Sequence, residues 1–388
     1  MFTKLNVALL LSGAFLITSC KKDDKEETPT TSNPTTYNFA DTTAGFAKGD
    51  TVFLMLSELG TKMNYVKTVG NTLEDATMKN MLTGTGFTNT ALNTTSFALE
   101  DLVTAGNDAT LSPLSVTAID VINVAIDSLK LNANPVGTAA APTAGTIGTA
   151  GVMTVSGSTS AYVVNKYGYE YQQLIDKGLM GSLIYFQITN ELVSSNSIGT
   201  SVAQADKIKN WDLAFKLFGV PSNYNTLLTS GLTNAQIRAK MKYFGAYAFD
   251  RKNDAKLPNA IGDIYNAFIA GRVAINNNDQ ATLDAQVTII QREMEKVWTA
   301  TMIKYIDDAV GTTDNARINH SLSELLVFIK GLQYNGYSAR VTNTEITTWL
   351  ATFNHTNILT QGVNFYEVDN TELNALRTTI ATKFGYTF

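Results

Sequence analysis

Two ionisable side chains four positions apart offer the clearest candidate chemistry in this chain. His320 and Glu324 fall on one face of an expected helix, because residues four apart are neighbours on a helical surface. The pair could supply two ligands to a metal ion, or a base with the carboxylate that orients it. It could also point to solvent, since leucines occupy the opposite face. The chain has one other histidine, His355, which lies in an expected loop. Two histidines are too few for a multi-histidine metal centre, which is therefore excluded.

Three further charged residues sit within helical segments that are otherwise largely apolar. Glu170 either complements the N-terminal dipole of a helix or faces a cleft beside neighbouring tyrosines. Asp212 and Arg272 are expected to face inward, where ion pairing is the usual explanation of a charge. Together with His320 and Glu324, these residues form the candidate ligand cleft. The sequence has no His-Glu-x-x-His, nucleophile elbow, phosphate loop or dinucleotide-binding glycine motif.

A metal centre in this cleft would need more ligands than one histidine and one glutamate. If His320 and Glu324 bind a metal, Glu170 and Asp212 are the best candidates for the remaining positions. One imidazole with several carboxylates suits a harder ion than a thiolate or multi-histidine site does. The sequence therefore allows iron or another divalent metal as a cofactor but does not establish that any cofactor is bound.

The first 19 residues have the pattern of a lipoprotein signal peptide. Lys4 provides a positive start, and Val7–Ile17 form an apolar core that is too short to span a bilayer. Ile17-Thr18-Ser19-Cys20 resembles a bacterial lipobox, whose cysteine is lipidated and becomes the new N-terminus. Cys20 is the sole cysteine of the chain, so no intrachain disulfide can form. We therefore expect lipid, such as palmitate, on Cys20 to provide the membrane attachment.

Residues 20–37 are expected to form a disordered tether. A charged run at 21–27 precedes a stretch rich in Thr, Ser, Asn and Pro, and neither can bury much apolar area. The Lys-Asp-Asp behind Cys20 resembles the signal that exports some lipoproteins of Gram-negative bacteria to the outer face of the outer membrane. We expect an outer-membrane lipoprotein that faces the cell surface, with the periplasmic face as the alternative.

Helical periodicity dominates residues 38–388, which we expect to form one all-helical domain. Apolar residues recur every three or four positions in segments 50–66, 73–82, 112–129, 167–192, 204–218, 233–250, 260–276, 279–310, 318–332, 344–350 and 371–384. Residues 137–160 are mostly small, and we expect a long flexible loop there. The expected fold class is all-α, with antiparallel helix bundles joined by long loops.

Composition narrows the set of partners. A net charge of −5 provides no basic footprint for nucleic acid. A hydrophobic content of 44% with 16% charged residues is typical of a folded protein, and no apolar run after the signal peptide reaches membrane-spanning length. We expect a monomer that contacts the membrane through its lipid.

An ordered series of short motifs runs through the chain: Tyr167–Gly181, Trp211–Phe215, Phe218–Pro221, Ala267–Arg272, Glu295–Trp298 and Leu322–Leu325. The series resembles an uncharacterised lipoprotein family, domain of unknown function 4856, which is distantly imelysin-like. The resemblance implies packed helical bundles and an extracytoplasmic lipoprotein; imelysin-like relatives are linked to iron or other metal acquisition and were once labelled peptidases. The chain departs from the family pattern at Asn210, where a histidine commonly precedes the Trp-Asp pair, and it lacks the imelysin Gly-x-His-x-x-Glu signature.

These observations lead to one expected function and two alternatives. We expect a non-enzymatic, lipid-anchored binding protein that serves metal (iron) or nutrient acquisition, with an outer-membrane transporter as a partner. The first alternative is a surface interaction protein that binds a polysaccharide or a transport partner. The second is a metal-dependent hydrolase of the imelysin-like peptidase type. Carboxylates clustered in a cleft would favour metal, whereas aromatic rings gathered on an exposed face would favour polysaccharide.

Overall fold

The computed structural model describes residues 33–386, apart from 69–70, 112–113, 134–146, 255–256, 258, 336–339 and 354–363. The signal peptide, Cys20, most of the expected tether and His355 lie outside the described residues. Residues 34–388 belong to one compact unit. Tyr37, expected at the end of the tether, is instead buried in that unit.

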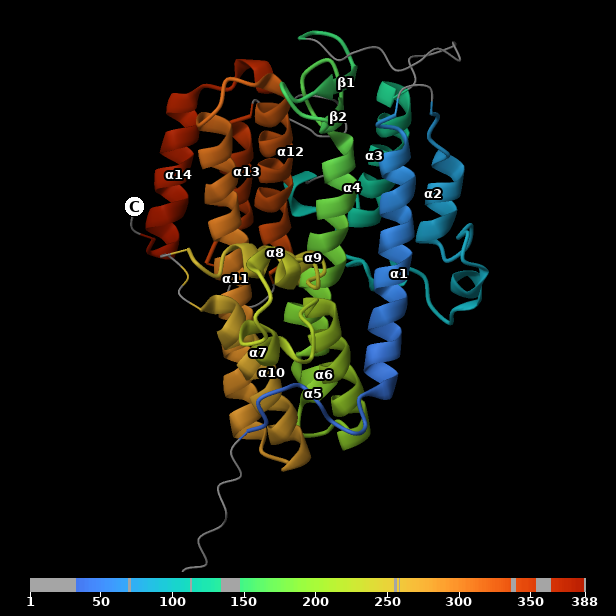
Figure 1. The fold of residues 1–388 in the computed structure, drawn as a ribbon, viewed down its shortest axis with the longest axis vertical. Helices are drawn as coiled ribbons and strands as arrows, with labels where there is room; N and C mark the ends of the chain where they lie inside the picture. Colours follow the sequence, from blue (N-terminus) through green and yellow to red (C-terminus); the bar gives the residue numbers. More distant parts are fainter. Residues whose placement is uncertain are drawn as a thin grey trace, which may run out of the picture. The chain divides into compact units, whose positions relative to one another are not determined.

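The described chain is predominantly helical, which confirms the predicted all-α fold class (Figure 1). Its α-helices are α1 Thr43–Tyr65, α2 Asp75–Leu82, α3 Ala118–Ala133, α4 Tyr171–Leu179, α5 Ser195–Ile198, α6 Gln204–Phe218, α7 Tyr224–Leu228, α8 Asn234–Arg238, α9 Tyr243–Asp250, α10 Ala260–Asn276, α11 Gln280–Val310, α12 Asn315–Gly331, α13 Asn343–Ala351 and α14 Asn370–Phe384. No helix in the described part of the chain is long and apolar enough to cross a membrane.

The prediction of a long flexible loop at 137–160 is wrong for the C-terminal part of that segment. Two short strands, β1 Gly151–Thr154 and β2 Ala161–Val164, pair antiparallel, with Gly151 opposite Val164. The hairpin forms because valines at 152, 163 and 164 are buried, so even a segment of mostly small residues has apolar area to bury. Residues 137–146 lie outside the described chain.

Three predicted helix boundaries are also corrected. α1 begins at Thr43, so Asp50 lies inside the helix and does not cap it; its carboxylate instead lies 2.7 Å from the Nζ of Lys216. The segment 233–250 forms two helices, α8 and α9, because the backbone of Tyr243 has a left-handed φ of 40°. α3 begins at Ala118 rather than at 112. At this start the N–H of Thr117 donates to the carboxylate of Asp120, and the N–H of Asp120 donates to the hydroxyl of Thr117.

The helix that follows Glu170 changes its winding along its length. After α4, Met180–Tyr185 and Gln187–Leu192 are wound as π-helix, whose wider turns alter the backbone pairing. The carbonyl of Thr189 accepts a hydrogen bond of 2.7 Å from the side chain of Gln291 in α11. Gly181 in this segment packs closely against α12, since a Cβ there would lie 3.5 Å from the Cα of Gly331.

α11 runs through much of the unit in Figure 1 and contacts α10, α12 and α14. Trp298 of α11 donates a hydrogen bond of 2.7 Å from Nε1 to the carbonyl of Phe328 in α12. Gly331 follows three residues later, and a Cβ there would lie 2.2 Å from the indole. The glycine is therefore required by the tryptophan ring that occupies the space beside it.

The same construction joins α6 to α10. Trp211 donates from Nε1 to the carbonyl of Phe268 at 2.8 Å, and a Cβ on Gly271 would lie 2.1 Å from the indole. Both tryptophans are fully buried. Two helix pairs are thus held together by the same Trp–Phe–Gly arrangement, which fixes how α6, α10, α11 and α12 present their charged residues.

Candidate functional site

A carboxylate and an imidazole 150 positions apart meet between α4 and α12. Glu170 precedes α4 and makes no side-chain cap bond; its Oε2 instead lies 2.8 Å from the Nδ1 of His320. The backbone N–H of Glu170 donates to the Oγ of Ser323, one turn after His320, at 2.9 Å. The Glu170 side chain is fully buried, whereas His320 is 26% exposed. Glu170 thus occupies the N-cap position of α4, with its carboxylate directed at His320, and it does not line the cavity that His320 lines.

Glu324 and Tyr162 complete the surroundings of the imidazole. The Nε2 on the opposite edge faces the Oε1 of Glu324 at 3.7 Å. Tyr162 of β2 stacks on the imidazole with ring centroids 4.2 Å apart and an interplanar angle of 12°. The hairpin that the sequence did not predict therefore covers one face of this histidine.

Glu324 is buried rather than pointing to solvent, which corrects one predicted alternative. Its Oε1 lies 3.6 Å from the Nζ of Lys177, and its Oε2 accepts from the hydroxyl of Tyr247 at 3.4 Å. Burial raises the pKa of Glu324 to about 7; Lys177 opposes the shift, and the nearby charge of Glu170 adds to it. At neutral pH the carboxyl of Glu324 is therefore partly protonated.

Lys177 provides the positive charge of this network. Burial lowers the pKa of Lys177, but Asp176 at 2.5 Å, Tyr247 and Glu324 outweigh that effect and hold it well above the ordinary value. The side chain therefore stays an ammonium ion despite being only 13% exposed. Lys177 was not predicted as a site residue, because beside Asp176 it has the sequence pattern of an ordinary surface pair.

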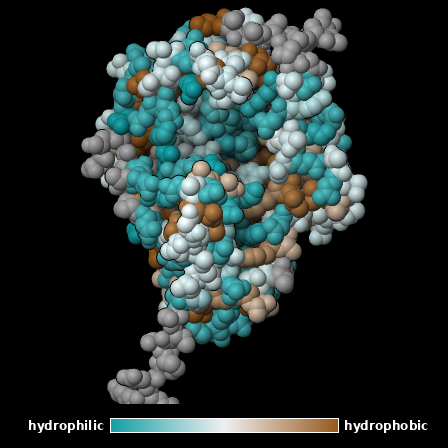
Figure 2. Space-filling view, viewed as in Figure 1, coloured by the Kyte–Doolittle hydropathy of each residue, from teal (hydrophilic) through white to brown (hydrophobic). Residues whose placement is uncertain are grey.

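The network reaches the surface at His320, which lines a cavity of about 560 Å³. Tyr162 and Ser321 line it with His320, and α11 contributes Lys304 and Asp308. The face drawn in Figure 2 is hollowed near its middle and bordered mainly by hydrophilic surface. The cavity can accommodate a small polar molecule in contact with the imidazole.

Several buried oxygens near His320 have no hydrogen-bond donor among the described residues. They are the Oε1 of Glu170, the Oε1 of Gln173 and the Oδ1 of Asn319. The amide nitrogen of Gln173 lies 3.5 Å from the Nδ1 of His320, which places this side chain in the same cluster. Buried acceptors without a donor are uncommon in folded proteins, but none of these three residues lines the cavity itself.

Asp212 and Arg272 form a second cluster rather than a wall of the same cleft. The Nε of Arg272 lies 3.1 Å from the Oδ1 of Asp212, and both side chains are buried, as predicted for an inward ion pair. Tyr37 donates to the same oxygen at 2.5 Å, and Asp41 pairs with the guanidinium. Burial raises the pKa of Asp212, although Tyr37 and Arg272 oppose the shift. This cluster holds residues 37–41 against α6 and α10.

The predicted five-residue cleft is therefore divided in two. Glu170, His320 and Glu324 lie together, whereas the contacts of Asp212 and Arg272 are with the N-terminal segment. Among the described residues, no group of three or more His, Cys, Asp or Glu side chains is placed to hold a metal ion. Metal binding by His320 and Glu324 stays a prediction, without the contribution expected of Asp212.

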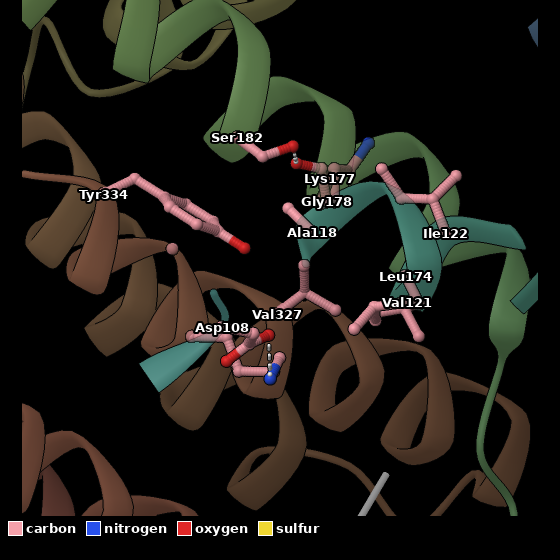
Figure 3. A pocket seen from close by; sticks show the side chains of 12 residues that line it. Asp108, Ala118, Val121, Ile122, Leu174, Lys177, Gly178, Ser182, Val327 and Tyr334 are labelled. Atoms are coloured by element: carbon pink, nitrogen blue, oxygen red, sulfur yellow. Dashed lines mark hydrogen bonds and ion pairs between the residues drawn. The ribbon is translucent and has the colours of Figure 1, made fainter. Parts of the chain in front are cut away.

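A third buried ion pair, Asp108 with Lys330 of α12, was missed by the sequence reasoning. The Nζ of Lys330 lies 2.8 Å from the Oδ2 of Asp108 beside an enclosed cavity of about 10 Å³, into which the ring of Tyr334 points (Figure 3). Burial raises the pKa of Asp108, but Lys330 outweighs it and lowers the pKa overall. The sequence signal was a lone lysine within the apolar run 325–332.

The fold and the site define an all-helical protein in which a buried ionic network opens on a polar cavity. The chain belongs to the family described as Domain of unknown function (DUF4856), whose family model matches residues 34–387. Comparison with curated proteins gives no significant match, and neither does comparison with solved structures.

Proposed function

We propose that this protein is a lipid-anchored, extracytoplasmic binding protein whose small polar ligand occupies the cavity at His320. The observation that carries the proposal is the position of His320. It joins the buried carboxylates of Glu170 and Glu324 to a cavity of about 560 Å³. Lipid on Cys20 would hold the protein at the outer membrane, where it would deliver a metal ion or another nutrient to a transporter.

The ligand chemistry is inferred from the charged groups at the cavity and behind His320. The charged side chains that line the cavity are Lys304, Asp307, Asp308 and Arg317, which suit a small polar or charged ligand. The carboxylates of Glu170 and Glu324 do not line the cavity but flank the imidazole that does, and they favour a ligand with N–H or O–H groups, or a cation, over a polysaccharide. Tyr162, which could stack on a sugar, is already stacked on His320.

A binding role is preferred to a catalytic one because of the neighbours of His320. In the described part of the chain, its hydrogen-bond partners are Glu170 and Gln173, and no serine, threonine or cysteine is among them. Its second ring nitrogen faces the carboxylate of Glu324. Two carboxylates beside one imidazole form an acceptor-rich cluster, which suits a ligand that carries N–H or O–H donors, or a cation.

The imidazole signals provide a direct test, because the chain has two histidines. Long-range ¹H–¹⁵N spectra would be recorded with Fe²⁺, Zn²⁺, Ca²⁺, putrescine and glucose as probes, and His320→Gln would assign the two rings. At least one probe should shift the His320 signal and leave that of His355 unchanged.

Two carboxylate-to-amide changes make the test specific. Glu170→Gln should weaken binding of that probe by about tenfold, since it removes a buried charge beside the imidazole. Glu372→Gln, an exposed change of the same kind in α14, should have no effect. A probe set that never shifts His320, or binding that survives Glu170→Gln unchanged, would contradict the proposed site.

A further inference from the structure

We propose that a second cavity, which has Lys177 among its lining residues, binds an organic anion: a carboxylate or phosphate monoester on an apolar body. This Lys177 cavity has a volume of about 830 Å³ and lies between α1, the end of α6 and residues 238–247. It is separate from the cavity at His320, with which it shares no lining residue. The site goes beyond the proposed function, because its charge selects a different class of ligand.

The cavity is lined by more positive than negative side chains. Its ionised lining residues are Lys177, Lys216, Arg238, Lys240, Lys242 and Asp50. Asp50 pairs with Lys216, and Asp250 pairs with Arg238 from outside the lining. Within the described residues, Lys240 and Lys242 have no acidic partner. Two exposed ammonium groups are therefore available to an anion at the rim.

Lys177 also lines the cavity, but its ammonium is already paired. Its side chain is 13% exposed, and its Nζ lies 2.5 Å from the Oδ2 of Asp176 and 3.6 Å from the Oε1 of Glu324. The cations available to an anion are therefore the exposed Lys240 and Lys242, and an anion at this rim would find no carboxylate already bound to them among the described residues.

An apolar wall stands beside these charges. The rings of Phe53 and Tyr243 stack with centroids 5.2 Å apart, and Leu54 on the same helix as Phe53 is 53% exposed. Met241 and Val220 also line the cavity. Inorganic phosphate would contact the cations alone, whereas an anion with an apolar body would also cover this wall.

The backbone fixes Lys242 at the rim. Its N–H donates to the carbonyl of Gly219 at 2.8 Å. Gly219 ends α6 with a φ of 82°, and a Cβ there would lie 2.1 Å from the carbonyl oxygen of Lys242. Only glycine permits this contact, so the segment that carries Lys240 and Lys242 is held directly against the end of α6.

Calorimetry with small anions on the soluble chain after residue 33 tests the proposal. Phenyl phosphate and benzoate present the two headgroups on an apolar body, inorganic phosphate presents a headgroup alone, and phenol presents the body alone. We expect phenyl phosphate or benzoate to bind, and to bind at least about tenfold more tightly than either phosphate or phenol. The arm that binds more tightly identifies the headgroup.

Paired substitutions locate the binding. Lys240→Gln with Lys242→Gln should weaken binding of the better anion about tenfold, whereas Lys166→Gln with Lys209→Gln should not change it. The control pair removes the same charge from exposed lysines outside the lining. All four changes are on exposed side chains, so folding should be preserved.

The proposal is overturned if no anion binds at about 10 mM, or if the Lys240 and Lys242 pair leaves affinity unchanged. It is also overturned if phenol binds as tightly as the anions. Glu170→Gln should leave anion binding unchanged within about twofold, which separates failure here from failure of the site at His320.

Discussion

The Nζ of Lys177 lies 3.6 Å from the Oε1 of Glu324, and this buried contact connects the Lys177 cavity to the residues behind the cavity at His320. Lys177 lines one cavity, while Glu324 also lies 3.7 Å from His320, which lines the other. A charged ligand in either cavity would therefore act on the same Lys177–Glu324 pair. The protonation of Glu324 is the property of this network most open to experiment.

The stability of the protein should depend on pH through Glu324. Burial raises its pKa from 4.5 to about 7, so the folded chain favours the protonated carboxyl. Its contribution to the free energy of unfolding is fully present below pH 4.5 and is lost as the pH rises through about 7, a difference of about 3 kcal/mol. Glu324→Gln should flatten this decline in urea unfolding curves measured from about pH 5 to 8.

Glu345 provides the control of opposite sign. Lys383 and Thr342 lower the pKa of Glu345 to about 2, so its contribution is present above pH 4.5 and is lost as the pH falls through about 2. Glu345→Gln should therefore flatten the acid limb, and above pH 5 it should lower the stability by a constant amount without changing the slope. An unaltered neutral limb in Glu324→Gln would show that Glu324 does not titrate there.

Adding a methyl group to either glycine that faces a tryptophan should destabilise the fold. Gly271→Ala and Gly331→Ala would place a Cβ about 2.1 and 2.2 Å from Trp211 and Trp298, which is impossible without movement of the ring or the helix. We expect each to cost at least about 1–3 kcal/mol of unfolding free energy. Thermal unfolding followed by circular dichroism measures the loss.

The same substitution in an open position should have the opposite effect. A Cβ on Gly60 in α1 would meet nothing within 4 Å. Gly60→Ala should therefore stabilise the protein by about 0.5–1 kcal/mol, because alanine restricts the unfolded helix segment more than glycine does. If all three variants behaved alike, steric contact with the indoles would not be the cause.

Removing Arg272 should leave a buried carboxylate without its cation. Arg272→Leu is expected to lower the free energy of unfolding by about 3–5 kcal/mol, because Asp212 would keep only the hydroxyl of Tyr37. Arg292→Leu changes an exposed arginine of α11 and should stay within about 0.5 kcal/mol of the parent. Denaturant unfolding curves distinguish the two variants. A loss below about 1 kcal/mol for Arg272→Leu would contradict the prediction that Asp212 depends on this cation.

Attachment to the membrane should depend on Cys20. Cys20→Ala should abolish metabolic labelling with a fatty acid and release the protein from membranes, since no other cysteine exists. The parent chain and an Asp23→Asn variant serve as controls and should both be labelled. Labelling that persists in Cys20→Ala would refute lipidation at this position.

Local signals in the sequence determined the bounds of several long helices. α6 was predicted with its observed bounds because Gly219 and Pro221 end it, and α10 because its apolar residues recur at helical spacing. The inward direction of Asp212 and Arg272 also followed from the apolar residues around them. These properties depend on residues within one or two turns, which a single sequence displays directly.

Tertiary structure alone decided which charges meet. Glu170 and His320 are 150 positions apart, and no spacing rule relates them. Lys177 looked like a partner of Asp176, and only the packing of α4 against α12 brings it to Glu324. Burial sets the pKa of Glu324, and burial is a property of the packed helices rather than of the residue. The sequence therefore determined the long helices, whereas packing determined the short helices α5 and α7, the hairpin and the site.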